Sequence, residues 1–223
     1  MSEDLGNRRP LKSRDTGWAR QGAAALARVG VSPDAVSAGA VLFAILGGAA
    51  FAASGLLPPA PRAGALVAAA LCVQLRLICN LMDGMVAVEH GRGGPHGPIW
   101  NELPDRIADA LFLIGAGYGA GLAGAAWAEP LGWLCAVLAV LTAYIRELGR
   151  ALGQPADFSG PGAKPQRMAI LTIAAVVATV EPLWHWRGQT LGAALALVAL
   201  LAAITAVRRT LTLAARLRAA SGA

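Results

Sequence analysis

Six stretches of mainly apolar residues divide the chain, and polar or proline- and glycine-rich segments separate them. The stretches cover about residues 35–54, 64–82, 99–121, 131–152, 165–180 and 190–207. Most of them approach the roughly 20 apolar residues that a helix needs to cross the hydrocarbon core of a bilayer. The pattern therefore predicts an all-α integral membrane protein with six transmembrane helices.

A shorter amphipathic segment precedes the first apolar stretch. Over residues 15–29, Trp18, Ala23 and Leu26 recur at helical spacing, with Arg20 among them. The pattern indicates an N-terminal amphipathic helix lying in the membrane interface. An ordinary linker helix would show the same periodicity, so the spacing alone leaves both alternatives open.

The composition supports a membrane protein with one domain. Hydrophobic residues make up 56% of the 223 residues and charged residues only 14%, whereas about a quarter of the residues in a soluble domain are charged. We expect a six-helix membrane domain over residues 34–208. Residues 1–33 would hold a cytoplasmic tail and the interfacial helix. Residues 209–223 would be a basic cytoplasmic tail, which could form another interfacial helix.

The basic residues gather on one side of the predicted bundle. They are Arg8, Arg9, Lys12, Arg14, Arg20, Arg28, Arg92, Arg150, Lys164, Arg167, Arg208, Arg209, Arg216 and Arg218. The opposite side has Arg62 and Arg187. Because cytoplasmic loops are rich in lysine and arginine, we expect a bacterial inner-membrane protein with both termini in the cytoplasm. Contact with the lipid bilayer also explains the net charge of +6 better than nucleic acid, which we do not expect as a partner.

The cysteines and histidines do not indicate a metal site or a disulfide framework. Cys72, Cys79 and Cys135 lie inside apolar stretches and form no C-x-x-C pair. Buried free thiols are the expected state of such residues. The three histidines are scattered in loops, and we expect none of them to be a ligand.

Polar side chains gather where the second stretch ends and the third begins. Asn80 and Asp83 are three residues apart, and Asn101, Asp105 and Asp109 follow at intervals of four. Each set therefore shares one helix face. The charge distribution places both sets at the cytoplasmic end of the bundle. Clustered oxygen ligands suit a hard cation such as Mg²⁺ or Mn²⁺, which in turn suits phosphate chemistry.

The same side chains could instead hold the helices together. Arg76 could neutralise Asp83, and Arg106 could neutralise Asp105. Hydrogen bonds and ion pairs of this kind connect helices inside membranes. The spacing alone does not separate a metal site from such a structural cluster.

The spacing resembles the signature of the CDP-alcohol phosphatidyltransferases. That family carries D-x-x-D-G-x-x-A-R, then eight residues, then G-x-x-x-D-x-x-x-D. This chain has Asn80, Asp83, Gly84, Ala87, Val88, Gly97, Asn101 and Asp105 at the corresponding positions, without a gap. The six-span layout and the interfacial helix are similar as well, so the resemblance covers nearly the whole chain.

Three positions depart from the family signature. Asn80 and Asn101 stand where the family has aspartates, and Val88 stands where it has an arginine. The family's four carboxylates hold two divalent ions around the CDP pyrophosphate. Amide oxygens carry no charge, so a second ion should bind more weakly here. Arg76 could replace a metal's charge, contact phosphate, or pair with Asp83.

The resemblance implies a phosphatidyltransferase of phospholipid biosynthesis. Such an enzyme transfers the phosphatidyl group of a CDP-linked lipid to a small alcohol, free or phosphorylated, and releases CMP. Asn80, Asp83, Asn101 and Asp105 would hold one or two Mg²⁺ or Mn²⁺ ions. Asp105 would also be the general base. Gly84, Ala87 and Gly97 would line the CDP-binding site. We also expect a homodimer.

A second, weaker similarity concerns the acceptor. The segments around Arg146 and over residues 162–167 look similar to those of the phosphatidylglycerophosphate and phosphatidylinositol-phosphate synthases. These members use phosphorylated acceptors, which implies that Arg146, Lys164 and Arg167 bind an acceptor phosphate. The alternative is that these residues only follow the positive-inside rule.

The sequence also allows two other functions. A catalytically degenerate relative could bind lipid or nucleotide, or act as a partner of another membrane protein. The spacing N-x-x-x-D-x-x-x-D over residues 101–109 also resembles the first motif of the intramembrane prenyltransferases. Those proteins are longer and need a second aspartate motif, which this sequence lacks.

Overall fold

The computed structural model of the chain describes residues 16–89 and 96–221. Most of the predicted N-terminal tail and part of the polar segment between the second and third apolar stretches lie outside the described residues. So do the side chains of Val88 and Asn101, although the backbone of both residues is helical.

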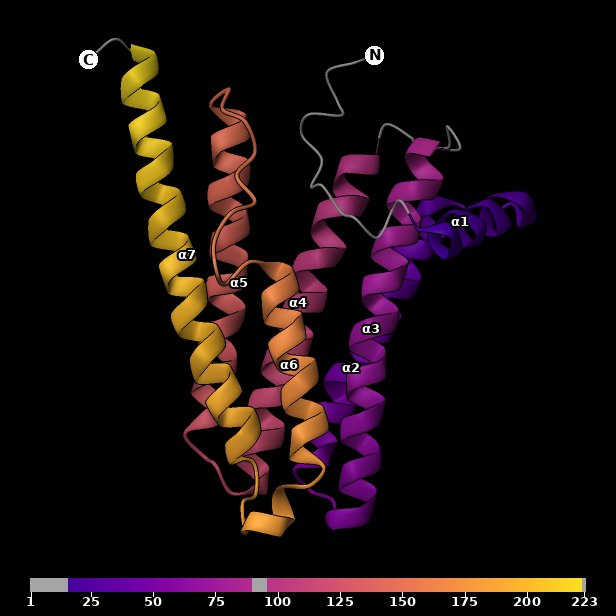
Figure 1. Cartoon of the computed structure of the whole chain (residues 1–223), viewed down its shortest axis with the longest axis vertical. Coiled ribbons are helices and arrows are strands. Elements are labelled where there is room, and N and C mark those ends of the chain that lie inside the picture. Colours follow the sequence, from indigo (N-terminus) through magenta and orange to yellow (C-terminus); the bar gives the residue numbers. More distant parts are fainter. Residues whose placement is uncertain (1–15, 90–95, 222–223) are drawn as a thin grey trace.

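Every regular element in the described residues is a helix. These elements are α1 (Gly17–Val29), α2 (Pro33–Ser54), α3 (Pro59–Glu89), α4 (Gly97–Ala123), α5 (Ala128–Ala151), α6 (Lys164–Ala178), η3 (Glu181–Trp184) and α7 (Gln189–Ser221). The helices α2 to α7 run alternately up and down in one bundle (Figure 1). The all-α fold predicted from the hydrophobic pattern is confirmed.

Four helices in the described part of the chain are long and apolar enough to cross a bilayer. They are α2, α3 over Pro59–Ala87, α5 and α7. Helix α6 has 15 residues, fewer than the roughly 20 that a span needs, and α4 begins with the polar residues of the motif. The chain is thus a multi-pass membrane protein by its helices, but the prediction of six spans is not confirmed.

Helices α3 and α7 extend beyond the apolar stretches that predicted them. Helix α3 begins at Pro59. Proline has no N–H group, but the amides of the first helical turn have no partner within the helix, so proline is well tolerated there. Helix α7 continues without a break from Gln189 to Ser221. The expectation of another interfacial helix after residue 208 was therefore wrong. At 33 residues, α7 is roughly 50 Å long, so it extends beyond a hydrocarbon core of about 30 Å.

Helix α1 runs transverse to the bundle helices near the start of α2 and projects from one side of the bundle (Figure 1). Its buried face consists of small residues, including Ala19 and Ala23, which pack against Met82 and Met85 of α3. Trp18 on the same helix is exposed. This direction is the one that a helix in the membrane surface takes, which favours the interfacial position over a linker helix.

Small residues let the central helices approach at backbone distance. A Cβ atom on Gly117 of α4 would lie 2.9 Å from the Cα of Gly132 on α5. A Cβ on Gly115 would overlap the backbone of Gly48 on α2. Close approach of this kind is how membrane helices gain packing energy without a hydrophobic driving force. It fixes α4, the helix that carries the second half of the motif, against two neighbours.

A buried ion pair closes the end of the bundle opposite α1. Arg62 donates to Glu181 at 2.7 Å, and the amides of Gly188 and Thr190 donate to the same carboxylate at 2.9 and 2.6 Å. Burial acts to raise the pKa of Glu181, but these hydrogen bonds and Arg62 outweigh it, so the pKa is lowered. The stabilisation is therefore present at neutral pH and is lost as the pH falls through that lowered pKa.

We expect Glu181→Ala to lower the free energy of unfolding by about 3–5 kcal/mol, because it leaves Arg62 buried without its carboxylate. Thermal unfolding of the purified protein in detergent measures the change. Glu129→Ala is the matched control, since Glu129 is exposed at the same end of the bundle. Equal midpoints for the two variants would contradict a stabilising role for the pair.

Candidate active site

Arg76 of α3 is the centre of a polar cluster that connects α3, α4 and α6. Its side chain is completely buried. Nη2 donates to Asp105 Oδ1 and Asp109 Oδ1, each at 3.0 Å, and to the carbonyl oxygen of Asp105 at 3.1 Å. The partners of Arg76 are thus Asp105 and Asp109, and not Asp83.

Lys164, the first residue of α6, reaches the same cluster. Its Nζ lies 2.5 Å from Asp105 Oδ2. With the Asn80 amide in the orientation that satisfies its neighbours, Asn80 donates to Asp105 Oδ1 at 2.7 Å and accepts from Lys164 Nζ at 3.1 Å. The structure therefore brings Asn80, Asp105 and Lys164 together, although the sequence placed Lys164 with the acceptor residues.

Arg167 completes the buried cluster one turn further along α6. Its Nη2 donates to Asp109 Oδ2 at 2.7 Å, and its Nη1 donates to the carbonyl oxygen of Gly162 at 2.6 Å. The side chain is buried. Both oxygens of Asp109 are therefore paired with arginines, one from α3 and one from α6.

Asp83 lies in the same region with a different environment. The residue is 5% exposed, and Ser37 of α2 donates to its Oδ2 at 2.7 Å. Its Oδ1 is buried and has no hydrogen-bond partner in the described residues. A buried carboxylate oxygen without a partner is costly, so this atom is suited to a ligand.

The segment between α5 and α6 explains how Lys164 reaches the cluster. From the end of α5 it turns back along the bundle, and α6 begins well below the top of its neighbours (Figure 1). The amide of Gly162 donates to Thr205 Oγ1 at 2.8 Å, and a Cβ on Gly162 would overlap the backbone of Leu201. Glycine is therefore required where the segment packs against α7.

A second group of charges surrounds the cluster on its outer side. Arg106 donates to Glu102 at 3.1 Å. Arg146 pairs with Glu102 and donates to Glu147 at 2.7 Å. These pairs are only partly buried, so each contributes little to stability. They hold Arg146, a predicted acceptor residue, at the rim of the site.

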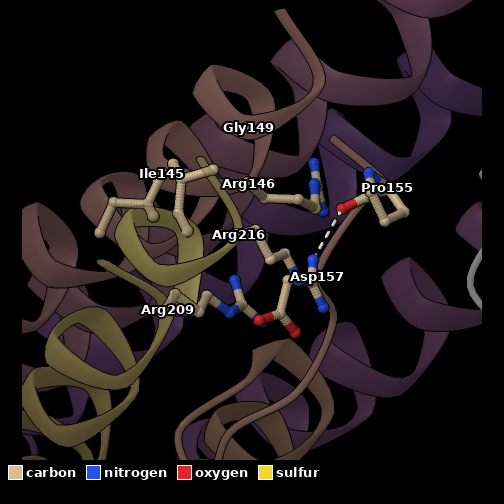
Figure 2. Close-up of a pocket in the computed structure, with 8 residues that line it drawn as sticks. Ile145, Arg146, Gly149, Pro155, Asp157, Arg209 and Arg216 are labelled. Carbon is tan, nitrogen blue, oxygen red and sulfur yellow. Dashed lines mark hydrogen bonds between the residues drawn. The ribbon is translucent and has the colours of Figure 1, made fainter. Parts of the chain in front are cut away.

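Arg146 also lines a small pocket between α5, the 152–163 segment and α7. Figure 2 shows the carboxylate of Asp157 there beside the guanidinium groups of Arg209 and Arg216. Burial acts to raise the pKa of Asp157, but hydrogen bonds from Ser159 and the two arginines lower it overall. The pocket is thus rich in cations and holds one ionised carboxylate.

The buried cluster consists of three cations and three carboxylates. The cations are Arg76, Lys164 and Arg167, and the carboxylates are Asp83, Asp105 and Asp109. Both oxygens of Asp105 and of Asp109 are paired with these cations. Within the described residues, no group of three or more histidine, cysteine, aspartate or glutamate side chains could hold a metal ion. Among the described carboxylates of the cluster, Asp83 Oδ1 is the oxygen that could take a divalent cation without displacing a cation of the protein.

Two of the three predicted CDP-binding residues follow Asp83 on α3. Gly84 and Ala87 are half-buried on the turn that follows Asp83. At the start of α4, a Cβ on Gly97 would meet no atom within 4 Å.

Sequence reasoning missed Ser37, Arg209 and Arg216. Ser37 lies 46 residues before Asp83, and no local pattern connects the two. Arg209 and Arg216 are seven residues apart on α7, which puts them on one helix face, and this spacing was the available signal. The sequence assigned both arginines only to the positive-inside pattern.

Comparisons with known proteins give matches among solved structures. No protein-family model and no curated protein sequence matches the chain. Phosphatidylinositol phosphate synthase (PgsA1) of Mycobacterium tuberculosis, in complex with manganese and citrate, matches with a TM-score of 0.72 and 25% identity over 87% of this chain and 88% of that chain. The same protein with CDP-DAG bound matches with a TM-score of 0.71 and 26% identity over 87% and 92%.

The chain has the fold of a CDP-alcohol phosphatidyltransferase. The comparison confirms the resemblance drawn from the motif spacing, including the similarity to the phosphatidylinositol-phosphate synthases. The structural relative holds manganese in one crystal and CDP-DAG in another. The buried cluster described above is therefore the candidate active site of this fold.

We expect Gly162→Ala to lower the free energy of unfolding by about 1–3 kcal/mol, because the added methyl group forces the segment away from α7. Chemical denaturation in detergent measures the change. Gly64→Ala is the control, since a Cβ there meets no atom within 4 Å. An unchanged stability in Gly162→Ala would mean that the close contact with Leu201 does not hold the segment.

Proposed function

We propose that the chain is a phosphatidyltransferase of phospholipid biosynthesis. The hydroxyl of a small alcohol attacks the phosphorus of the phosphatidyl group in a CDP-linked lipid. The bond to the CMP oxygen breaks, and CMP leaves. The observation that carries this proposal is the polar cluster. It includes Asp83 and Asp105 of the signature, in a fold that binds CDP-DAG in its relative.

In this proposal Asp105 is the general base. Its side chain is next to Asn80 and Lys164, and it would take the proton of the acceptor hydroxyl. A base must lie within hydrogen-bond reach of the proton that it removes. The central place of Asp105 between α3 and α6 meets that condition for an acceptor held at the cluster.

Asp83 is the residue best suited to a divalent cation, Mg²⁺ or Mn²⁺. Its unpartnered Oδ1 offers a charged oxygen. The signature also assigns Asn80, Asn101 and Asp105 to the ion, but Asn80 and Asp105 already pair with Lys164, so Asp83 would be its main protein ligand. Such an ion supplies positive charge to the pyrophosphate oxygens. Gly84, Ala87 and Gly97 would leave room for the CDP group.

The acceptor would lie on the side of Arg146. We assign Arg146, Lys164 and Arg167 to its binding, and the neighbouring pocket adds Arg209 and Arg216. Arginine forks pair well with phosphate oxygens. This concentration of cations favours a phosphorylated alcohol over its uncharged parent.

The distribution of basic residues supports an active site on the cytoplasmic face. We place the protein in a bacterial inner membrane with both termini in the cytoplasm. The large apolar side chains exposed on α2, α5 and α7 face lipid in this arrangement. We further propose that the active form is a homodimer.

We expect the purified protein to release CMP from CDP-diacylglycerol when Mg²⁺ and a suitable alcohol are present. A panel of free and phosphorylated polyols identifies the acceptor. Chelation of the metal with EDTA should abolish release, and added Mg²⁺ or Mn²⁺ should restore it. Asp105→Ala should lower the rate at least about 100-fold, the lower range for loss of a general base.

These measurements also separate the enzyme from a catalytically inactive lipid-binding relative. Such a protein would bind the CDP-lipid without releasing CMP with any acceptor. Cellular lipids would then be unchanged by Asp105→Ala. That pair of results would contradict the proposed function.

We expect Asp83→Asn to abolish the Mg²⁺-dependent activity, because it removes the charged oxygen that the cation needs. A rate measured over a series of Mg²⁺ concentrations tests this. Ser37→Ala is the companion variant, since it removes only the hydrogen bond to Asp83 and should have a smaller effect. Retained activity in Asp83→Asn with the same Mg²⁺ requirement would show that Asp83 is not a ligand.

A further inference from the structure

Lys164 carries a positive charge that the buried cluster fixes in place. Its Nζ lies 2.5 Å from Asp105 Oδ2 and 3.1 Å from the Asn80 oxygen. An ammonium group has three N–H donors, so these two contacts leave one donor for another acceptor. The side chain is 15% exposed, which leaves that donor within reach of a ligand.

We propose that Lys164 is a fixed cation of the catalytic centre and binds a phosphate of the CDP pyrophosphate. It would take the place of a second divalent ion, so that the centre works with one ion, held at Asp83. This inference rests on the proposed phosphatidyltransferase function. It assigns the remaining N–H donor of Lys164 to the donor substrate in place of the acceptor.

The oxygen atoms of the cluster support a single ion. Lys164 and Arg76 take both oxygens of Asp105, and the Asn80 oxygen accepts from Lys164. Arg76 and Arg167 take both oxygens of Asp109. The unpartnered carboxylate oxygen among these buried aspartates is Asp83 Oδ1. A second ion bound through Asp105 would have to displace Lys164.

Charge balance leads to the same conclusion. The three cations and three carboxylates of the cluster cancel. Arg106, which also lies 3.6 Å from Asp105, is balanced by Glu102. The pyrophosphate of a CDP-lipid brings one negative charge on each phosphate, which one divalent ion compensates. A second ion would leave an excess of positive charge in a buried site, and unpaired buried charge is strongly unfavourable.

The unpartnered N–H groups of Arg76 also favour a bound anion. Its Nη1 and Nε are buried and have no hydrogen-bond partner in the described residues. Buried donors of a charged group normally have partners. A phosphate oxygen reached by Lys164 would lie near the same guanidinium group, because both cations bind Asp105.

The number of bound ions is the direct test. The full-length protein in lipid nanodiscs is titrated with Mn²⁺ in the presence of CDP, and electron paramagnetic resonance measures free Mn²⁺. We expect one ion per chain in the wild type and in Asn80→Asp, where the new carboxylate pairs with Lys164. The double variant Asn80→Asp with Lys164→Met should bind two. Two ions in the wild type, or one in the double variant, would overturn the inference.

The affinity for CDP, measured without an acceptor, is the second readout. Lys164→Met should weaken it roughly tenfold or more, the range for a hydrogen bond to a charged group. Lys164→Arg should retain most of the affinity. Gln166→Ala is the control, because Gln166 is exposed on the same turn of α6. Unchanged CDP affinity in Lys164→Met would assign Lys164 to the acceptor alone.

Failure of this inference differs from failure of the proposed function. A wild type that releases CMP but binds two Mn²⁺ ions retains the function and loses the role of Lys164. A wild type that binds no CDP and releases no CMP loses both.

Discussion

Burial of charge between α3, α4 and α6 is the constraint on which the site depends. Arg76 is fully buried and its Nη2 binds Asp105 and Asp109 together. Removing any one partner would leave a charge without compensation in a low-dielectric interior, which costs several kcal/mol. The arginine and the two aspartates therefore stabilise the structure only as a set. The set fixes α4 relative to α3, and Arg167 extends it to α6.

The same constraint determines what the centre can do. A cluster that is already neutral has little attraction for several divalent ions, and its remaining capacity lies at Asp83. The fixed cations are preorganised toward an anion, so they need little rearrangement when a pyrophosphate binds. The chain would then use lysine and arginine for part of the work that metal ions perform elsewhere. This would explain how the proposed chemistry is retained with asparagines at two signature positions.

Much of the fold could be predicted because membrane helices leave a clear pattern. The six apolar stretches correspond to α2 through α7, and the spacing of Asn80, Asp83 and Asp105 indicated the candidate site. The ion pairs could not be predicted, because residues 29 to 33 positions apart contact only after the helices pack. The sequence suggested an ion pair between Arg76 and Asp83. In the structure Arg76 pairs with Asp105 and Asp109. The buried position of Lys164 could not be predicted from the sequence either, because it depends on the contact between Gly162 and α7.

A crystal structure of the protein with CDP and Mn²⁺, with anomalous diffraction recorded at the manganese edge, tests the central claim most directly. The account predicts one anomalous peak per chain, next to Asp83, with the ammonium of Lys164 within hydrogen-bond distance of a phosphate oxygen. Two peaks bridged by Asp105, with Lys164 displaced from that carboxylate, would contradict it.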